Sequence, residues 1–167
     1  VGFGPKNFGL SQSTINKRVS EALKIVGLKG VRDEHPLDLS LDDKKLIAIA
    51  SIISMKPDVI ILDEPTTGQD HEGIRKVKSI IKELSKDHTV IIISHNMQLV
   101  AEVADRVVVM YDKEVLFDGL PSEAFNKVKL LKKTYLKPPL ITQLARSFKE
   151  LSNESLTIKD LIKGLEN

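Results

Sequence analysis

Two short aliphatic runs, Val59 to Leu62 and Thr89 to Ile93, constrain the fold of this chain more than any other feature. Neither run is broken by a charged residue, a pattern typical of a strand that is buried on both faces of a sheet. Ile74 to Ser85, which lies between them, has the spacing of a helix. Strand, helix and strand in this order predict a βαβ crossover with two parallel strands. We therefore expect an α/β fold.

The rest of the chain is predicted to be mostly helical, with one hairpin. Gly2 to Gly9 is rich in Gly, Pro and Asn and is predicted to be a loop. A helix is predicted between the cap Ser11 and the stop Gly27. Further helices are predicted at Asp42 to Met55, Met97 to Ala104, Ser122 to Leu136, Ile141 to Leu151 and Thr157 to Leu165, the last with a capping box formed by Thr157 and Asp160. An antiparallel pair is predicted from Arg106 to Tyr111 and Glu114 to Phe117, joined by the turn Asp112-Lys113.

Composition narrows the class of protein. At 167 residues, 41% hydrophobic and 29% charged, the chain is long enough for one domain and a modest appendage. A net charge of +2, spread along the chain, does not indicate a nucleic-acid partner. The lack of cysteine excludes disulfides and thiolate metal sites, and no run approaches the roughly 20 apolar residues of a membrane span. The chain opens on Val1 without Met, which suggests a fragment.

The strongest functional signal is the stretch from Val59 to Asp70, V-I-I-L-D-E-P-T-T-G-Q-D. Ligands of open α/β sheets bind beyond the carboxyl ends of the strands, and Asp63 and Glu64 follow the first run directly. Asp63 can hold Mg²⁺ through water while Glu64 reaches another point of a phosphate site. His95 follows the second run and is placed to meet the same ligand. The alternatives are a pair of solvated loop acids and a capping or core histidine.

The same stretch resembles the Walker B motif and D-loop of ABC ATPases. The resemblance implies that Asp63 binds Mg²⁺, that Glu64 polarises the attacking water, and that Gly68-Gln69-Asp70 forms the D-loop, with Asp70 near the nucleotide. His95 is similar to the switch histidine of this family, which contacts the γ-phosphate. The implied fold is a P-loop NTPase-like core with a helical subdomain and a C-terminal helical extension. The implied cofactors are ATP and Mg²⁺.

Two flanking segments look like those of ATPases from energy-coupling-factor transporters, which import vitamins or cobalt and nickel ions. These segments are Phe3 to Leu10 and the residues Leu130-Leu131, Leu136, Pro138-Pro139 and Ile141 to Ala145. The resemblance implies an ATP-hydrolysing subunit on the cytoplasmic face of the membrane. Its implied partners are a second ATPase subunit, in a homo- or heterodimer, a transmembrane energy-coupling protein and a substrate-binding membrane component. The transported substrate is not encoded in this chain, although Lys137-Pro138-Pro139 slightly favours the metal-ion branch.

The sequence departs from the ABC pattern in two places. No G-x-x-x-x-G-K-[ST] occurs in the 167 residues, for which truncation is a simpler explanation than natural loss, and the fragment alone is expected to be inactive. The signature L-S-G-G-Q is replaced by Leu39-Ser40-Leu41-Asp42-Asp43. Ser40 can cap the following helix, whose N-terminus would face ATP held by the partner subunit. Asp42 brings a negative charge there, and like charges a few Å apart repel by about 1 to 4 kcal/mol. We therefore expect a weak or inactive signature.

The predicted organisation has three segments and leaves competing functions open. The segments are 1–56, a helical subdomain with the signature helix; 57–120, a RecA-like core with Walker B, D-loop and switch histidine; and 121–167, a helical extension. A non-hydrolysing regulatory module is one alternative, favoured by Asp42 and opposed by Asp63, Glu64 and His95. A DNA-maintenance ATPase of the SMC or Rad50 kind is another, which the lack of sustained heptads opposes.

Overall fold

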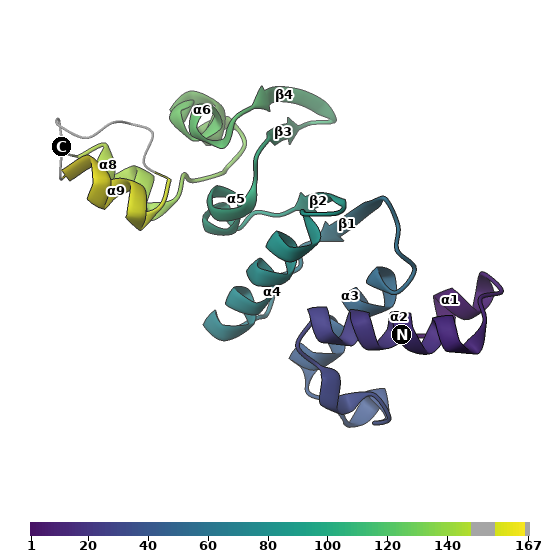
Figure 1. The fold of residues 1–167 in the computed structure, drawn as a ribbon. Helices are drawn as coiled ribbons and strands as arrows, with labels where there is room; N and C mark the ends of the chain where they lie inside the picture. The colour runs from purple at the N-terminus through teal and green to yellow at the C-terminus, as the bar shows by residue number, and fades with distance from the viewer. Residues whose placement is uncertain (148–155, 166–167) are drawn as a thin grey trace. The chain divides into compact units, whose positions relative to one another are not determined.

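The computed structural model describes residues 1–147 and 156–165, and the chain forms two compact units, Val1–Ile93 and Ser94–Asn167 (Figure 1). The elements of the first unit are α1 (Phe3–Asn7), α2 (Gln12–Ile25), the 3-10 helices η1 (Lys29–Val31) and η2 (Pro36–Asp38), α3 (Leu41–Ile53), β1 (Val59–Asp63), α4 (His71–Leu84) and β2 (Thr89–Ile93). Those described in the second unit are α5 (Met97–Val103), β3 (Val107–Tyr111), β4 (Glu114–Gly119), α6 (Pro121–Asn126), α7 (Val128–Lys133), α8 (Leu140–Ala145) and α9 (Ile158–Leu165). The three-segment division predicted from the sequence stays a prediction.

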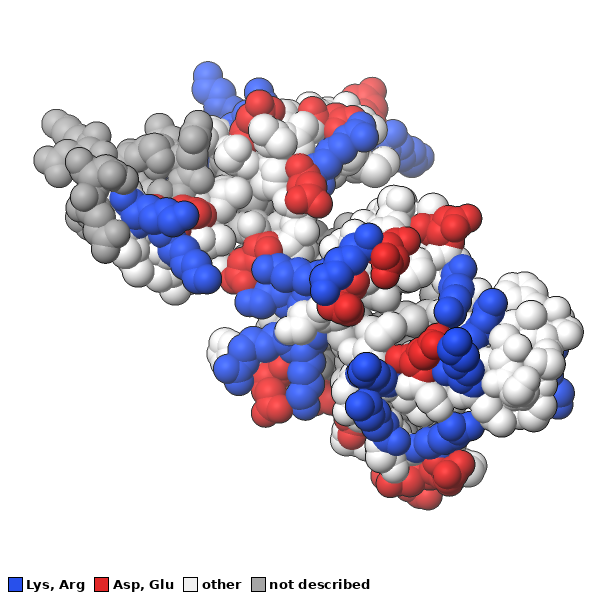
Figure 2. Space-filling view, in the orientation of Figure 1, with Lys and Arg blue, Asp and Glu red and all other residues white. Residues whose placement is uncertain are grey.

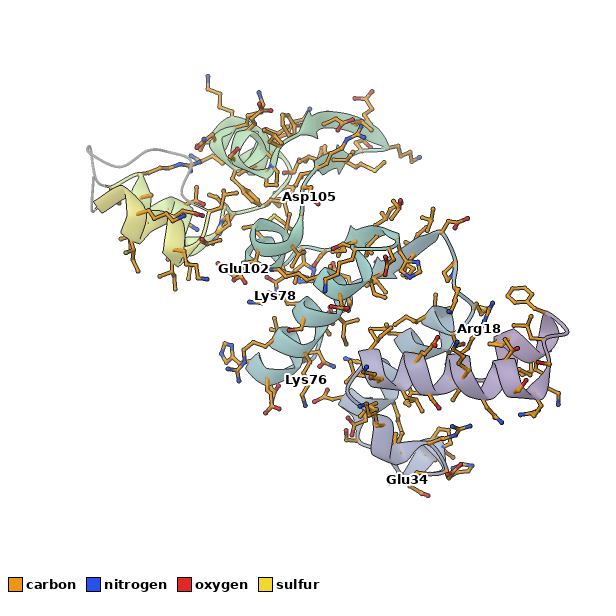
Figure 3. All side chains as sticks on the ribbon, viewed as in Figure 1. Arg18, Glu34, Lys76, Lys78, Glu102 and Asp105 are labelled. Atoms are coloured by element: carbon orange, nitrogen blue, oxygen red, sulfur yellow. The ribbon has the colours of Figure 1, made fainter. Side chains whose placement is uncertain are left out.

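Helices α1, α2 and α3 pack together in the first unit. Ser11 caps α2, because its hydroxyl oxygen accepts a hydrogen bond of 3.3 Å from the backbone N–H of Thr14. The chain leaves α2 through Gly27, whose φ of 77° lies in the left-handed region that glycine adopts without strain. Arg18, labelled in Figure 3, donates from Nη1 to the carbonyl oxygen of Met55 at 3.2 Å. This bond ties α2 to the end of α3.

The predicted βαβ crossover is confirmed. Strands β1 and β2 are parallel, with Val59 opposite Thr89 and Asp63 opposite Ile93. The crossover helix α4 packs against β2 and lies beside the two strands in Figure 1. Its buried aliphatic residues recur at helical spacing and are Val77, Ile80, Ile81 and Leu84. Burial of each large aliphatic side chain stabilises the fold by about 1.5–3 kcal/mol, so this stripe fixes α4 on the sheet.

The prediction that both strands are buried on both faces is wrong for the described residues. In β1, Ile60 and Leu62 are 1% and 8% exposed, whereas Ile61 is 62% exposed. Ile91 and Ile93 of β2 are also about half exposed. Burial alternates because successive side chains point to opposite faces of a strand, and α4 supplies a covering layer for one face. The unbroken aliphatic run predicted a covering layer on both faces, and the described residues cover only one.

Four predictions about helical segments need correction. The segment Gly2 to Gly9, predicted to be a loop, contains α1, which ends where Gly9 adopts a φ of 69°. Helix α4 begins at His71, three residues before the predicted start, because the Asp70 side chain caps it. The single helix predicted from Ser122 to Leu136 is interrupted at Lys127, whose ψ of 71° is not helical. Helix α8 ends at Ala145, and residues 148–151 of that predicted helix lie outside the described residues.

The second unit contains the predicted hairpin and a small core. Strands β3 and β4 are antiparallel, and both turn residues, Asp112 and Lys113, have positive φ as a tight hairpin turn requires. The core lies around Ala101, Phe125 and Leu131. The capping box of α9 is confirmed, since Asp160 N–H donates to Thr157 and Thr157 N–H donates to Asp160. None of the helices in residues 1–147 and 156–165 has both the length and the apolar character that a membrane crossing needs.

Candidate functional site

Asp63 and Glu64 stand at the carboxyl end of β1, as the sequence predicts. Asp63 is the last residue of the strand, and its side chain is exposed. Glu64 continues the pairing with β2, because its N–H donates to the carbonyl oxygen of Ile93 at 2.8 Å. Its φ of 45° is unusual for a residue other than glycine and turns the chain sharply out of the sheet. The two neighbouring carboxylates therefore leave the strand in different backbone conformations, which suits two different roles.

The loop of residues 64–70 is folded tightly on itself. Thr67 N–H donates to the carbonyl oxygen of Glu64 at 3.1 Å, and the Thr67 hydroxyl donates to Glu64 Oε2 at 3.3 Å. Gln69 N–H donates to the carbonyl oxygen of Thr66 at 3.1 Å. Gly68, with a φ of 72°, makes this reversal possible. The Glu64 carboxylate is thus partly held by its own loop.

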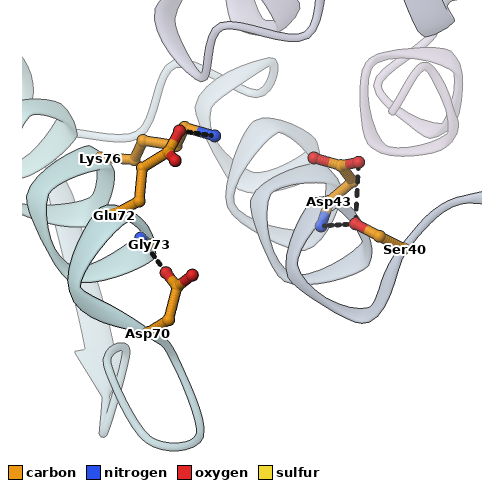
Figure 4. A network of polar contacts seen from close by, with 6 residues as sticks. All are labelled: Ser40, Asp43, Asp70, Glu72, Gly73 and Lys76. Atoms are coloured by element: carbon orange, nitrogen blue, oxygen red, sulfur yellow. Dashed lines mark hydrogen bonds and ion pairs between the residues drawn. The ribbon is translucent and has the colours of Figure 1, made fainter.

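Asp70 ends the loop and begins α4. Its Oδ1 accepts a hydrogen bond of 2.7 Å from the backbone N–H of Gly73 (Figure 4). A carboxylate at a helix N-terminus is also favoured by the helix dipole. Asp70 was a candidate for nucleotide binding, and that role stays a prediction, but one of its oxygens is already engaged in capping.

The replaced signature forms the start of α3. The predicted cap is confirmed, because Ser40 Oγ accepts from Asp43 N–H at 3.1 Å and donates to Asp43 Oδ2 at 2.8 Å (Figure 4). Asp42 Oδ1 accepts a hydrogen bond of 2.9 Å from Gln69 Nε2. Lys45 Nζ donates to the carbonyl oxygen of Thr67. The structure therefore brings the first turn of α3 into contact with the loop that carries Glu64.

His95 belongs to the second unit, and its position relative to Glu64 stays a prediction. The residue is exposed and directly precedes Asn96, the cap of α5. Asn96 Oδ1 accepts from Leu99 N–H at 3.0 Å, and Asn96 N–H donates to Ser94 Oγ at 3.1 Å. Asn96 therefore caps α5, and these bonds do not support the alternative that His95 is the capping residue.

Charged side chains of both signs lie on the first turns of α4, close to Asp70. Lys76 Nζ and Glu72 Oε1 are 3.0 Å apart on the first turns of α4 (Figure 4). The hydrogen bond to Glu72 raises the pKa of Lys76, and the charges of Asp43 and Asp70 add to this effect. Figure 2 shows Lys and Arg side chains interspersed with Asp and Glu over the visible face. A groove of about 350 Å³ between the end of α2 and α4 is lined by Val26, Arg75 and Ile80 among others, and contains none of the predicted site residues.

The donor set fits Mg²⁺ in one particular mode. No group of three or more His, Cys, Asp or Glu side chains suited to a metal occurs in the described part of the chain. Mg²⁺ commonly keeps several waters and is held by one or two carboxylates together with substrate phosphates. An exposed Asp63 at a strand end suits that mode.

Sequence reasoning missed two residues that shape the site, Lys45 and Gly73, and placed Gln69 in the D-loop without predicting its contact with α3. Gln69 and Lys45 connect the loop to α3. Gly73 lies in the first turn of α4, where a glycine costs helix stability and so signals a close approach. That glycine was the one signal in the sequence that could have led to the contact.

Comparison with known proteins identifies the family. Residues 5–67 match the model of the ABC transporter family. An energy-coupling factor transporter ATP-binding protein, EcfA2 of Clostridium tetani, is 42% identical over 100% of this chain and 62% of its own length. Residues 5–67 are therefore an ABC transporter domain. EcfA1 of Caldanaerobacter subterraneus is 44% identical over 98% of this chain and 61% of its own length.

A solved structure supports the ABC fold. CbiO1 from Clostridium perfringens, part of the ABC transporter complex cbiONQ, is 36% identical to this chain and superimposes with a TM-score of 0.70. The match covers 87% of this chain and 59% of CbiO1. The chain thus spans about three fifths of the length of the ABC relatives that it matches.

Proposed function

We propose that this chain is part of the ATP-binding and hydrolysing subunit of an energy-coupling-factor transporter. The observation that carries the proposal is the placement of Asp63 and Glu64 at the carboxyl end of a parallel strand, in a chain 42% identical throughout to an ATP-binding protein of that kind. Ligands of open α/β sheets bind at this edge. The imported cargo of such a transporter would be a vitamin or a cobalt or nickel ion.

Glu64 is the proposed general base for hydrolysis of the γ-phosphate bond of ATP. A water oxygen attacks the γ-phosphorus, the bond to the bridging oxygen of ADP breaks, and Glu64 orients that water and accepts its proton. The left-handed backbone of Glu64 and the Thr67 hydroxyl fix where the carboxylate lies. Because catalysis of phosphoryl transfer consists mainly of positioning and charge stabilisation, such fixed geometry is what the step needs.

Asp63 is the proposed ligand of Mg²⁺, through water, and His95 a proposed contact of the γ-phosphate. When bound, Mg²⁺ would neutralise charge on the phosphates. The ATP phosphates also need a phosphate-wrapping segment, and no G-x-x-x-x-G-K-[ST] occurs in the 167 residues. We therefore propose that this activity belongs to a full-length subunit on the cytoplasmic face of the membrane, paired with a second ATPase subunit and bound to a transmembrane energy-coupling protein and a substrate-binding membrane component.

Nucleotide trapping tests the proposal. Glu64→Gln removes the base and keeps the size of the side chain. In a full-length, assembled transporter it should lower turnover by at least about a hundredfold, in the range typical of general-base catalysis, and leave ATP bound. Glu34→Gln, at an exposed residue between η1 and η2, is a matched control that makes the same change of charge outside the site. Turnover that survives Glu64→Gln would overturn the proposed function.

A regulatory ABC module is the second candidate, favoured by the acidic first turn of α3. Asp42 and Asp43 occupy that turn, and the Ser40 hydroxyl donates its hydrogen to Asp43. The turn is thus poorly suited to a partner's polyanionic phosphate. In a dimer whose other signature is disabled, Asp42→Gly should raise turnover if this signature is weakened by its charge. A DNA-maintenance ATPase with long coiled coils is disfavoured, since the longest described helices have 14 residues.

A further inference from the structure

We propose that Asp42, Gln69 and Lys45 form a latch that holds the loop of residues 64–70 against the first turn of α3 and so positions the Glu64 carboxylate. The inference rests on the proposed role of Glu64. It goes beyond that role by proposing that three further residues control the position of the Glu64 carboxylate. None of the three contacts the phosphates in the proposal.

Both ends of the loop are fixed by other elements, so only its middle needs a further anchor. At the start, Glu64 N–H bonds to the carbonyl oxygen of Ile93 at 2.8 Å. At the end, the Asp70 carboxylate accepts from Gly73 N–H at 2.7 Å. Between these points the loop turns through Gly68, a residue with little conformational restraint of its own. The two side-chain contacts to α3 fall in this middle part.

The contacts lead directly to the Glu64 carboxylate. Lys45 Nζ donates to the carbonyl oxygen of Thr67, and the Thr67 hydroxyl donates to Glu64 Oε2 at 3.3 Å. A shift of α3 therefore moves Thr67, and with it the group that holds the carboxylate. Because a displacement of about 1 Å can cost two orders of magnitude in rate, a link of this kind suffices to set activity.

The Gln69 amide is seated between the first turns of two helices. Its Nε2 donates to Asp42 Oδ1 at 2.9 Å in a partly buried bond. On its other side lies Gly73, where an added Cβ would come within 2.0 Å of Gln69 Oε1. Asp42 supplies the acceptor and Gly73 the space, so the three residues depend on one another. The Asp42 carboxylate, which we expect to weaken the signature, thus also accepts a hydrogen bond within its own subunit.

Reversing the polarity of the bond tests the latch. Gln69→Glu is isosteric but places a carboxylate against Asp42, and repulsion between like charges should open the contact. Adding Asp42→Asn should close it again, because the new amide can donate to Glu at position 69. Gln12→Glu adds the same charge on the exposed surface of α2 and serves as the control.

The first readout is hydrogen exchange in a full-length, nucleotide-free protein. The amides of Thr67 and Gln69, both bonded within the loop, should exchange about tenfold faster in Gln69→Glu and return to the original rate in the double variant. Unchanged exchange in Gln69→Glu, or no recovery in the double variant, would overturn the latch. This readout does not depend on catalysis.

The second readout separates positioning from nucleotide binding. In the assembled transporter, Gln69→Glu should lower kcat about tenfold with KM for ATP unchanged, and Asp42→Asn should restore it. Two results would refute the latch, because each would mean that charge alone acts on the nucleotide. The first is a raised KM with unchanged kcat in Gln69→Glu. The second is an effect of Asp42→Asn on kcat that has the same size with Gln and with Glu at position 69. If Glu64→Gln left turnover intact, the proposed function would fail, while the exchange experiment would still decide the latch.

Discussion

Replacement of Gly73 by Ala offers a test in which an ordinarily stabilising change should destabilise. In a helix, Ala is favoured over Gly by about 0.5–1 kcal/mol. At this position, however, the added Cβ would lie 2.0 Å from Gln69 Oε1 and 2.9 Å from Gln69 Cδ. No heavy atoms tolerate such distances, so the Gln69 side chain must move away from α4. Its bond to Asp42 is then lost.

The net effect follows from two opposing contributions. A hydrogen bond to a charged group contributes about 1.5–3 kcal/mol, and the lower end applies to the partly buried bond from Gln69 to Asp42. Subtracting the helix gain of about 0.5–1 kcal/mol leaves a loss of roughly 0.5–1 kcal/mol for Gly73→Ala. In a Gln69→Ala background the nearest remaining atom is Cβ of residue 69, 3.1 Å from the new methyl group, which requires only a small shift. There Gly73→Ala should stabilise α4 by about 0.5 kcal/mol.

Native-state hydrogen exchange of the α4 amides measures both effects, because it reports the local free energy of opening. The expected result is a change of sign between the two backgrounds, and the non-additivity is the coupling energy of the pair. Gly73→Ala that stabilises α4 equally with Gln and with Ala at position 69 would refute the reasoning. It would mean that the Gln69 amide does not occupy the space beside Gly73.

Three further predictions concern stability. Ile81→Ala, at a residue 2% exposed on α4, should lower the free energy of unfolding by about 2–5 kcal/mol in urea titrations. Ser40→Ala removes the cap of α3 and should cost about 1 kcal/mol, seen as faster exchange of the first amides of α3. The hydrogen bond from Arg106 holds the pKa of Asp118 below its ordinary value of 3.8, so the hairpin is stabilised above that value and loses this contribution as the pH falls through the lower, folded pKa. NMR titration should show this loss at acidic pH in the original protein and not in Asp118→Asn.

The parts of the fold that local chemistry controls were predictable from the sequence. The aliphatic runs of β1 and β2 and the helix between them gave parallel strands, because a crossover of that length allows no hairpin. Hydroxyl caps were predictable for the same reason, since Ser11, Ser40 and Thr157 each act on the N–H group three residues away. The ABC assignment also followed from a local pattern, the stretch that ends in Asp63 and Glu64.

Burial depends on what covers an element, and the element's own residues do not state this. Ile60 and Ile61 are chemically identical neighbours, yet their exposed fractions are 1% and 62%. Only the side of β1 that carries Ile60 is buried, and no periodicity within the run could distinguish the two. The helix break at Lys127 was missed for a similar reason, because a lysine has no intrinsic tendency to end a helix.

For Asp42, local sequence reasoning selected the right residue but predicted only part of what its carboxylate does. From sequence, its charge has one effect, repulsion of a phosphate at the α3 N-terminus. In the structure the carboxylate also accepts the Gln69 amide, 27 positions away in the chain. Asp42→Gly removes both effects together, so a change in turnover in that variant cannot be assigned to either one. Gln69→Glu and the double variant with Asp42→Asn separate the contact between residues 42 and 69 from the charge at position 42. We expect the contact to be lost in Gln69→Glu and regained in the double variant. Only if kcat follows the contact, and not the charge, does the acidic signature act through Glu64.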